Sequence, residues 1–258
     1  MYRRPRIIPC LLVNNRDMVK TIKFSEQRYL GDIVNAVKIF NKKGVDELAI
    51  LDITASKEDK GLDVEFLKDI ASEAFMPLSY GGGIKNIEQV RELFSIGYEK
   101  VILNTSLVKN PEFIKEAVGY AGSQSIVASI DVKKDFFGRT VCYVKDGTEK
   151  VNINPVDLAK QAVKLGVGEI LLNSINNDGE MKGYDISLVK NVADAVPVPV
   201  IACGGAGKIA DLKAVLEEGN AHAAAAGSIF VYYGSNKAIL ITAPSEQELI
   251  DAGIYIND

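Results

Sequence analysis

The 258-residue sequence contains one histidine and three cysteines. A Ser/His/Asp or Cys/His nucleophilic triad would have to use His222, which stands at the start of an expected strand and not at its end. Metal catalysis requires at least three clustered ligands, and no His, Cys, Asp or Glu spacing of that kind occurs. Cys10, Cys142 and Cys203 are odd in number, and two of them lie in apolar stretches, so we interpret them as buried thiols. We therefore expect no metal, no cofactor and no histidine-dependent mechanism.

The sequence also lacks an excess of basic residues and long apolar runs. Its net charge is −4 and its isoelectric point is near 5.3, which argues against nucleic acid or an anionic membrane surface as a partner. No apolar run approaches the roughly 20 residues of a membrane span, and the basic segment Met1–Arg6 lacks the apolar part of a signal peptide. With 47% hydrophobic and 25% charged residues, the chain has enough mass for one large core. We expect a cytoplasmic protein with a single domain over residues 1–258.

Glycine-rich turns are the most informative feature present. Val200–Gly207 reads as a short apolar strand that ends in a glycine-rich turn, and Ala223–Phe230 reads as a second strand that ends in Gly227 and Ser228. Glycines at the carboxyl ends of neighbouring parallel strands let backbone N–H groups approach an anion, and the helix that follows adds a favourable dipole. This pattern predicts a phosphate cradle. The alternative is that the glycines only make tight turns.

The same pattern occurs earlier in the chain. Residues 76–106 match residues 198–228 element for element, with Gly81–Gly83 in place of the later glycine pair. The correspondence extends backwards, because Glu47–Thr54 matches Glu169–Ile175 and Arg6–Val13 matches Ser125–Val132. A period of about 120 residues is far longer than a solenoid repeat and indicates a duplicated half-domain. Two phosphate cradles are therefore expected.

Apolar strands alternate with amphipathic helices along the chain. Strands are expected at Ile7–Val13, Leu48–Ile53, Leu78–Tyr80, Lys100–Asn104, Ile126–Val132, Glu169–Asn173, Val200–Ala202 and Ala223–Ala226, and helices follow most of them. Eight such units, doubled from four, predict an α/β fold of the (β/α)8 TIM-barrel type with two (β/α)4 halves. A doubly wound open sheet is the alternative, but it does not explain the duplication. Two segments stand outside the pattern: a polar loop over Asn14–Tyr29 and a small hairpin over Lys133–Gly147.

In such a barrel the active site lies at the carboxyl ends of the strands. The residues expected there are Leu12, Asp52, Gly82, Gly83, Asn104, Asp131, Asn173, Asp178, Gly179, Gly204, Gly205, Gly227 and Ser228. Asp131 is a candidate general acid or base if burial raises its pKa, and the alternative is that it only accepts hydrogen bonds from loop N–H groups. Lys20, Lys23, Lys133 and Lys208 could supply positive charge around a phosphorylated ligand, although each alone is equally typical of a solvated lysine.

These motifs together resemble the cyclase subunit of imidazole glycerol phosphate synthase. The resemblance covers almost the whole chain and weakens after about Tyr233. It rests on Ile7–Leu11, Leu51–Ser56, Gly81–Ile84, Ile130–Val132, Asp178–Gly179 with Gly183–Asp185, and Ile201–Gly207. It implies a TIM barrel that receives ammonia from a glutaminase subunit docked at the amino-terminal face of the strands. It also implies a gate of four charged residues at that face, and Arg6, Glu47, Lys100 and Glu169 stand at the matching positions. The alternative for these four is a stabilising ring without transport.

One departure affects the chemistry that the resemblance implies. The family's cyclase uses aspartates at the ends of the first and fifth strands as general acid and base. Asp131 matches one of them, whereas Leu12 stands in place of the other and cannot transfer a proton. Because each acid–base group typically contributes a factor of about 10²–10⁴, a cyclase with this change should be severely impaired. Asn173 and Asn176 also replace the more usual Thr and Asp, while Lys20, Asn104 and Asp178 are retained.

An ammonia path without the cyclase acid resembles a divergent branch of the family, which supplies ammonia for acetamidino modification of bacterial surface sugars. Pro9–Leu12 and Gly227–Tyr232 are similar to that branch. The resemblance implies a glutaminase partner, a phosphorylated ligand between the cradles and a sugar amidotransferase that uses the ammonia. Two alternatives remain open: a working cyclase of histidine biosynthesis, in which Asp52 or Asp17 replaces the missing group, and a non-catalytic barrel that binds a phosphosugar and only activates the glutaminase. Two cradles suit a ligand with two phosphates better than a nucleotide-linked sugar.

Overall fold

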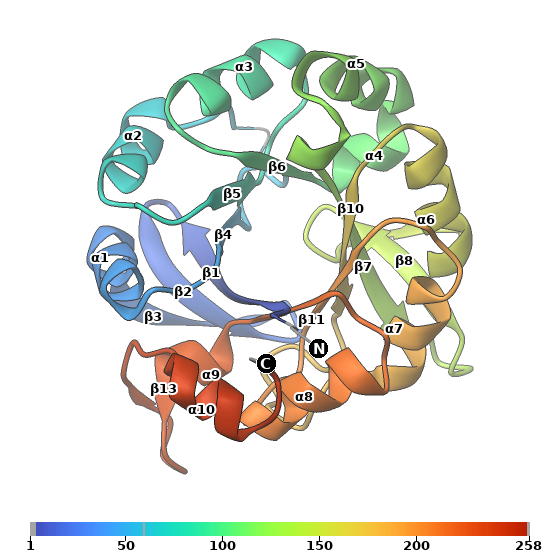
Figure 1. Cartoon of the computed structure of the whole chain (residues 1–258). Helices are drawn as coiled ribbons and strands as arrows, with labels where there is room; N and C mark the ends of the chain where they lie inside the picture. The colour runs from blue at the N-terminus through green and yellow to red at the C-terminus, as the bar shows by residue number, and fades with distance from the viewer. Residues whose placement is uncertain (1–3, 59, 257–258) are drawn as a thin grey trace.

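The computed structural model describes residues 4–58 and 60–256. Within these residues, parallel strands form a closed ring in which each strand pairs with the next and the last pairs with the first (Figure 1). In ring order the strands are β1 (Arg6–Asn14), β4 (Leu48–Asp52), β5 (Leu78–Gly81), β6 (Lys100–Leu103), β7 (Ile126–Lys134), β10 (Glu169–Ser174), β11 (Val200–Cys203) and β12 (Ala223–Ala226). The fold is the predicted (β/α)8 barrel, and β1 and β7 begin its two halves on opposite sides of the ring.

Helices surround the ring, as the view along the barrel shows (Figure 1). The long ones are α1 (Ile33–Lys43), α2 (Val64–Ser72), α3 (Ile87–Ser95), α5 (Pro111–Ala121), α6 (Pro155–Lys164), α7 (Ile186–Ala193) and α8 (Ile209–Glu217). Shorter ones are α4 (Thr105–Lys109), α9 (Ser228–Val231), α10 (Glu246–Asp251) and the 3₁₀ turn Ser123–Ser125. Most of the long helices begin where an Asp or Asn side chain accepts a backbone N–H, as Asp32 does for α1 and Asn86 for α3.

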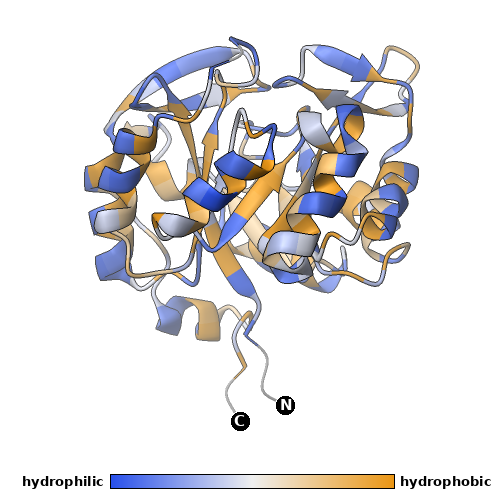
Figure 2. Cartoon of the chain, turned by 90° about the horizontal axis from the view of Figure 1, so that it is seen from above, coloured by the Kyte–Doolittle hydropathy of each residue, from blue (hydrophilic) through white to orange (hydrophobic). Residues whose placement is uncertain are grey.

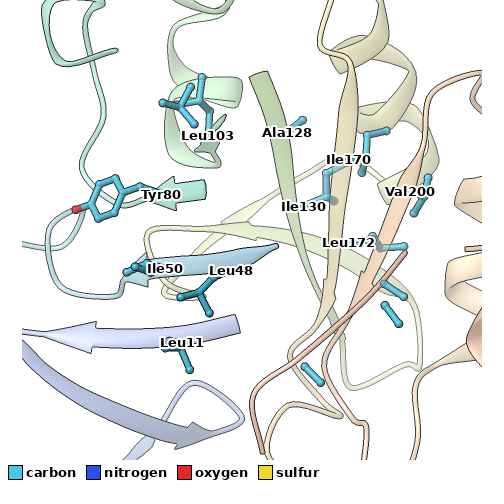
Figure 3. Packing of buried hydrophobic residues seen from close by; sticks show 14 of the residues in the cluster. Leu11, Leu48, Ile50, Tyr80, Leu103, Ala128, Ile130, Ile170, Leu172 and Val200 are labelled. Carbon is cyan, nitrogen blue, oxygen red and sulfur yellow. The ribbon is translucent and has the colours of Figure 1, made fainter. Parts of the chain in front are cut away.

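Alternation along the strands divides the buried side chains into two clusters. In β4, Leu48 and Ile50 face the helices, whereas Ala49 between them faces the interior of the ring. Figure 3 shows Leu48 and Ile50 with Ile170 and Leu172 of β10, which belong to the same outer cluster. The helices carry both hydrophilic and hydrophobic faces, while the strands inside are largely hydrophobic (Figure 2). The outer cluster holds the helices on the barrel, and the smaller inner cluster lines its interior.

The prediction of a polar loop over Asn14–Tyr29 is wrong. This segment forms an antiparallel hairpin of β2 (Asp17–Ile22) and β3 (Glu26–Asp32), and β2 pairs with the end of β1. Its turn contains Lys23 and Phe24 in the left-handed region, with φ of 53° and 59°. Because these two positions are usually Asn or Gly in a hairpin, the sequence carries no turn signal here.

The predicted hairpin at Lys133–Gly147 is confirmed and is longer than expected. β7 pairs with β8 (Thr140–Val144), which pairs in turn with β9 (Glu149–Val151). A further pair, β13 (Tyr232–Tyr233) and β14 (Ala238–Ile239), follows α9. Cys10, Cys142 and Cys203 are buried and not joined in disulfides, as predicted. In the part of the chain that the structure describes, no helix is long and apolar enough to cross a membrane.

Candidate functional site

A pocket of about 350 Å³ opens at the carboxyl ends of the ring strands. Every residue that the sequence predicts as catalytic or ligand-binding lines this pocket: Lys20, Asp52, Gly82, Gly83, Asn104, Asp131, Asn173, Asp178, Gly179, Gly204, Gly205, Gly227 and Ser228. Of the four candidate lysines, only Lys20 lines it. Lys23 instead forms an ion pair with Glu180 on the β2–β3 side of the barrel.

Asp131 is the most buried of the pocket carboxylates, with 7% of its surface exposed. It lies on β7, directly opposite Asn173 of β10 in the strand register. Burial raises the pKa of Asp131 to about 7, and the negative charges of Asp146 and Asp178 add to this effect. Hydrogen bonds from Asn173 and Ser129 stabilise the ionised form and oppose the shift. The carboxyl group can therefore both donate and accept a proton near neutral pH.

Leu12 occupies the matching position on β1, across the ring from Asp131. Its side chain lines the pocket together with Leu51, Ile102, Cys10 and Cys203. These residues come from β1, β4, β6 and β11 and add apolar side chains to the pocket lining. Leu12, Leu51 and Ile102 carry no ionisable group, and the hydrogen bond with Cys10, together with burial, raises the pKa of the Cys203 thiol well above its ordinary value.

Lys20 is held in the pocket by a buried ion pair. Its Nζ lies 2.8 Å from Oδ1 of Asp178 and 2.7 Å from the carbonyl oxygen of Thr21, and the Thr21 hydroxyl donates to the other Asp178 oxygen at 3.0 Å. The β2–β3 hairpin is thereby fastened to the loop after β10. The positive charge of Lys20 is largely balanced by Asp178, so it is not a free cation for a ligand.

The two glycine turns lie on opposite sides of the pocket, because β5 and β11 are four strands apart in the ring of eight. Gly82 and Gly205 have φ of +137° and +123°, and a Cβ atom would lie 2.7 Å from the Asp52 carbonyl oxygen at Gly82 and 2.1 Å from the Gly183 carbonyl oxygen at Gly205. The glycines are thus required by close packing between loops, which is the tight-turn interpretation. Phosphate binding is a separate question, and Ser228 bears on it because its hydroxyl oxygen is buried in the pocket without a partner.

Asp52 and Asn104 have structural partners as well. Oδ1 of Asp52 accepts hydrogen bonds from the N–H and hydroxyl groups of Thr54 and from the N–H of Ala55, which shapes the loop before α2. The Asn104 amide donates to the carbonyl oxygens of Ser129 and Tyr143 and so ties β6 to β7 and β8.

At the opposite end of the barrel, four charged side chains meet across the ring. Arg6, Lys100 and Glu169 begin their strands and Glu47 directly precedes β4. Arg6 pairs with Glu47 at 2.5 Å and with Glu169, and Lys100 Nζ lies 2.9 Å from both Glu47 and Glu169. Burial lowers the pKa of Arg6, but the two glutamates raise it more, so the net shift is upward. We call these four residues the charged ring.

Comparison with known proteins identifies the family. Residues 6–237 match the sequence model of the family described as histidine biosynthesis protein. The chain belongs to this family and is HisF-like. A protein of Leptospira interrogans named "Putative imidazole glycerol phosphate synthase subunit HisF" is 48% identical over 246 residues, which are 95% of this chain and 97% of that protein. One of Pseudomonas aeruginosa named "Putative imidazole glycerol phosphate synthase subunit hisF2" is 47% identical over 249 residues, 96% and 99% of the two chains. "Imidazole glycerol phosphate synthase subunit HisF" of Alkaliphilus metalliredigens is 42% identical over 227 residues, which are 88% of this chain and 90% of that protein.

Sequence reasoning missed part of the pocket of this HisF-like protein. Lys85, Lys109 and Lys145 line it on the side of the first glycine turn, and Asp146 lines it from the β8–β9 turn, where it pairs with Lys57. Lys109 pairs with Glu149 of β9 at 2.6 Å. The sequence could have indicated these residues only by their position, because each follows a ring strand within a few residues or lies in the hairpin after β7. Among the described residues of the HisF-like chain, no group of His, Cys, Asp or Glu is placed to hold a metal.

His222 and Cys142 lie outside the pocket. His222 directly precedes β12, at the amino-terminal end of the barrel, and its Nδ1 accepts the N–H of Val200 at 3.2 Å. Burial and the charge of Asp131 raise the pKa of the Cys142 thiol to about 12. Neither side chain is available to the chemistry of this HisF-like site.

Proposed function

We propose that this chain is an ammonia-channelling synthase subunit that works with a glutaminase partner and has given up the cyclase reaction. One observation carries the proposal. At one end of the barrel Leu12 stands across the pocket from Asp131, where a second carboxylate would be needed, and at the other end the charged ring is intact. The sites for receiving ammonia and for binding a ligand are then retained, while one of two acid–base groups is absent.

The barrel interior suits ammonia as the neutral molecule. Between the charged ring and the pocket, the axis is lined by the inner apolar cluster, which includes the small residues Ala49, Ala223 and Ala225, and by Ser79. An ammonium ion would lose its hydration there without a counter-charge, whereas NH₃ is small and uncharged. Ammonia entering past Arg6 and Lys100 would reach the pocket unprotonated and nucleophilic.

The charged ring defines the face at which the glutaminase would dock. It lies at the amino-terminal end of the strands, opposite the pocket, so ammonia and the acceptor approach from different ends. The names of the relatives call each of them a subunit, which supports an assembly of more than one chain. We propose that the ammonia serves to convert an acetamido group of a nucleotide-linked surface sugar into an acetamidino group, with a sugar amidotransferase as a further partner.

A genuine cyclase of histidine biosynthesis is the second candidate, and the names of the relatives favour it. It would need another acid near Leu12. Asp52 lines the pocket, but its Oδ1 already accepts three hydrogen bonds within its own loop. Asp17 is exposed on β2 and does not line the pocket. If this gene restored growth of a histidine auxotroph without added histidine, the result would support the cyclase. We expect no growth.

The test of channelling uses the chain reconstituted with its cognate glutaminase and acceptor system. Arg6→Ala and Lys100→Ala should uncouple glutamine hydrolysis from nitrogen transfer, so that ammonia appears in the solvent while product falls. Lys115→Ala, at an exposed ion pair with Glu112 on α5, is the control and should leave coupling unchanged. Unchanged coupling in both ring variants would count against channelling. If glutamine hydrolysis is stimulated but no nitrogen passes through the barrel, the chain is instead an activator that binds a phosphosugar.

A further inference from the structure

The positive charges of the pocket gather at the first of its two glycine turns, Gly81–Gly83. Among the described residues, the lysines that line the pocket are Lys20, Lys85, Lys109 and Lys145. Lys20 lies beside the second turn, because a Cβ atom at Gly227 would lie 3.1 Å from its Cε, and Asp178 balances its charge. Lys85 follows the first turn after one residue. The other two lysines come from α4 and from the turn between β8 and β9.

Contacts between loops place Lys109 and Lys145 beside the first glycine turn. The Ser106 hydroxyl of α4 donates to the carbonyl oxygen of Ile84, which directly follows that turn. The Thr105 hydroxyl of the same helix accepts the N–H of Lys145 at 3.2 Å. α4 is thus fastened to the glycine turn and to the β8–β9 turn, so both lysines line the same end of the pocket.

The two ammonium groups meet at a single carboxylate. Lys109 Nζ lies 2.6 Å from one oxygen of Glu149, and Lys145 Nζ lies 3.3 Å from the other. Glu149 begins β9 and does not line the pocket. Within this group two positive charges therefore face one negative charge, and both positive side chains reach the pocket while the negative one does not. We call Lys109 and Lys145 the lysine pair.

The backbone of the β8–β9 turn holds Lys145 at this place. Lys145, Asp146 and Gly147 have φ of 52°, 54° and 72° in succession. Lysine rarely adopts the left-handed region, and such strain persists only where the surroundings enforce it, often at sites that bind a ligand. Here Asp146 pairs with Lys57 of the loop after β4, and a Cβ atom at Gly147 would lie 3.0 Å from the ring of Phe24. The turn is therefore packed from two sides, and the lysine pair is in position before a ligand binds.

We propose that this end of the pocket binds a diphosphate group, with one phosphate on the first glycine turn and the adjoining phosphate on the lysine pair. Backbone N–H groups of a glycine turn suit one phosphate, and two ammonium groups at its edge suit a second one. The second glycine turn has only the balanced Lys20 beside it among the described pocket lysines, so it would receive a less charged part of the ligand. The inference rests on the proposed function in that a phosphorylated ligand occupies the pocket. It adds that two linked phosphates lie at one end, which is how the pocket would accommodate a nucleotide-linked sugar.

The test is a set of calorimetric titrations of the full chain with inorganic phosphate, pyrophosphate and symmetric dimethyl diphosphate. We expect pyrophosphate to bind about tenfold more tightly than phosphate, which corresponds to about 1.4 kcal/mol. Dimethyl diphosphate is esterified at both ends, as the diphosphate of a nucleotide-linked sugar is. If it also binds more tightly than phosphate, the site accepts a diphosphate within an ester linkage, and if it does not, the diphosphate is a terminal one.

The outcomes separate this inference from the proposed function. Pyrophosphate that binds no more tightly than phosphate would overturn the diphosphate site and leave a phosphorylated ligand in place. Failure of both to bind would overturn the phosphorylated ligand as well. The titrations contain no glutaminase, so channelling can fail while the diphosphate preference holds, and the reverse.

Variants assign the preference to the lysine pair. Lys109→Gln and Lys145→Gln should each reduce the tenfold preference for pyrophosphate to about threefold, because each removes one ammonium group. Lys115→Gln is the matched control, since Lys115 pairs with Glu112 on the outside of α5 and does not line the pocket. A preference that stays tenfold in both lysine-pair variants would refute the assignment.

Glu149→Gln tests the same assignment in the opposite direction. It removes the carboxylate that competes with the ligand for the lysine pair, so pyrophosphate should bind about threefold more tightly than to the unaltered chain. A general loss of folding cannot produce tighter binding. Unchanged or weaker binding of pyrophosphate by Glu149→Gln would count against a phosphate held between these two lysines.

Discussion

Replacing Asp131 with asparagine tests the electrostatics on which the site depends. The side chain is 7% exposed, and its pKa of about 7 lies roughly 3 units above the ordinary value of about 3.9. At 1.36 kcal/mol per unit, ionising this carboxyl group in the folded state costs about 4 kcal/mol relative to the unfolded chain. Asparagine has nearly the same shape and removes the titration.

The sign of the effect follows from proton binding in the two states. Below about pH 4 the carboxyl group is neutral in both states, and it contributes no penalty. Between about pH 4 and 7 the unfolded chain has released its proton while the folded chain keeps it, so the free energy of unfolding of the wild type falls as pH rises. Above about pH 7 both states are ionised and the penalty stays constant. Asp131→Asn should therefore gain stability relative to the wild type from pH 4 to 7 and then level off.

Urea unfolding of both proteins at pH 5 and pH 8 measures this difference. The advantage of Asp131→Asn should be larger at pH 8 by about 2–3 kcal/mol. Asp135→Asn provides a control of opposite sign, because hydrogen bonds from Arg139 and from the N–H of Phe137 outweigh burial and lower the pKa of Asp135. Because a lowered carboxyl pKa stabilises the folded state at every pH above the ordinary value, that variant should lose the same amount of stability at pH 5 and at pH 8. An advantage of Asp131→Asn that does not grow with pH would refute the raised pKa.

Two further substitutions test the packing around the pocket. Lys20→Met breaks the buried ion pair and leaves Asp178 unpaired, so it should lower the free energy of unfolding by about 3–5 kcal/mol, measured by urea denaturation. Lys20→Met together with Asp178→Leu should recover most of the loss. Gly205→Ala would place a Cβ atom 2.1 Å from the Gly183 carbonyl oxygen and should reduce stability by more than about 3 kcal/mol, measured in the same way. Gly138 has a φ of +76°, and a Cβ atom added there would meet no atom within 4 Å. Gly138→Ala should therefore lower the free energy of unfolding only by the roughly 1–2 kcal/mol that a left-handed backbone costs a residue with a side chain.

The barrel could be predicted from the sequence because its signals are repeated. Each half shows short apolar strands that end in glycine or a polar residue, and the correspondence of Gly81–Gly83 with Gly204 and Gly205 fixed the register of the duplication. Since strand ends gather at one face of a barrel, residues that are distant in sequence, such as Asp52 and Asn173, could be assigned to one pocket.

Other features depend on partners that a sequence does not reveal. The β2–β3 hairpin was missed for two reasons. Lys20 and Thr21 are polar but buried, because both donate hydrogen bonds to Asp178, which lies far along the chain. The turn of the hairpin also contains neither Asn nor Gly. Lys109 and Lys145 enter the pocket only because α4 and the β8–β9 turn fold over its rim.

The most direct measurement of the central claim is a cyclase assay. The purified chain is given the ribulosyl phosphoribosyl carboxamide ribotide of histidine biosynthesis with saturating ammonium salt and no glutaminase. Because Leu12 cannot transfer a proton, we expect no measurable imidazole glycerol phosphate, and we expect Leu12→Asp, which restores a carboxylate across the pocket from Asp131, to gain activity. Formation of imidazole glycerol phosphate by the unaltered chain at an appreciable rate would contradict the account and restore the histidine role.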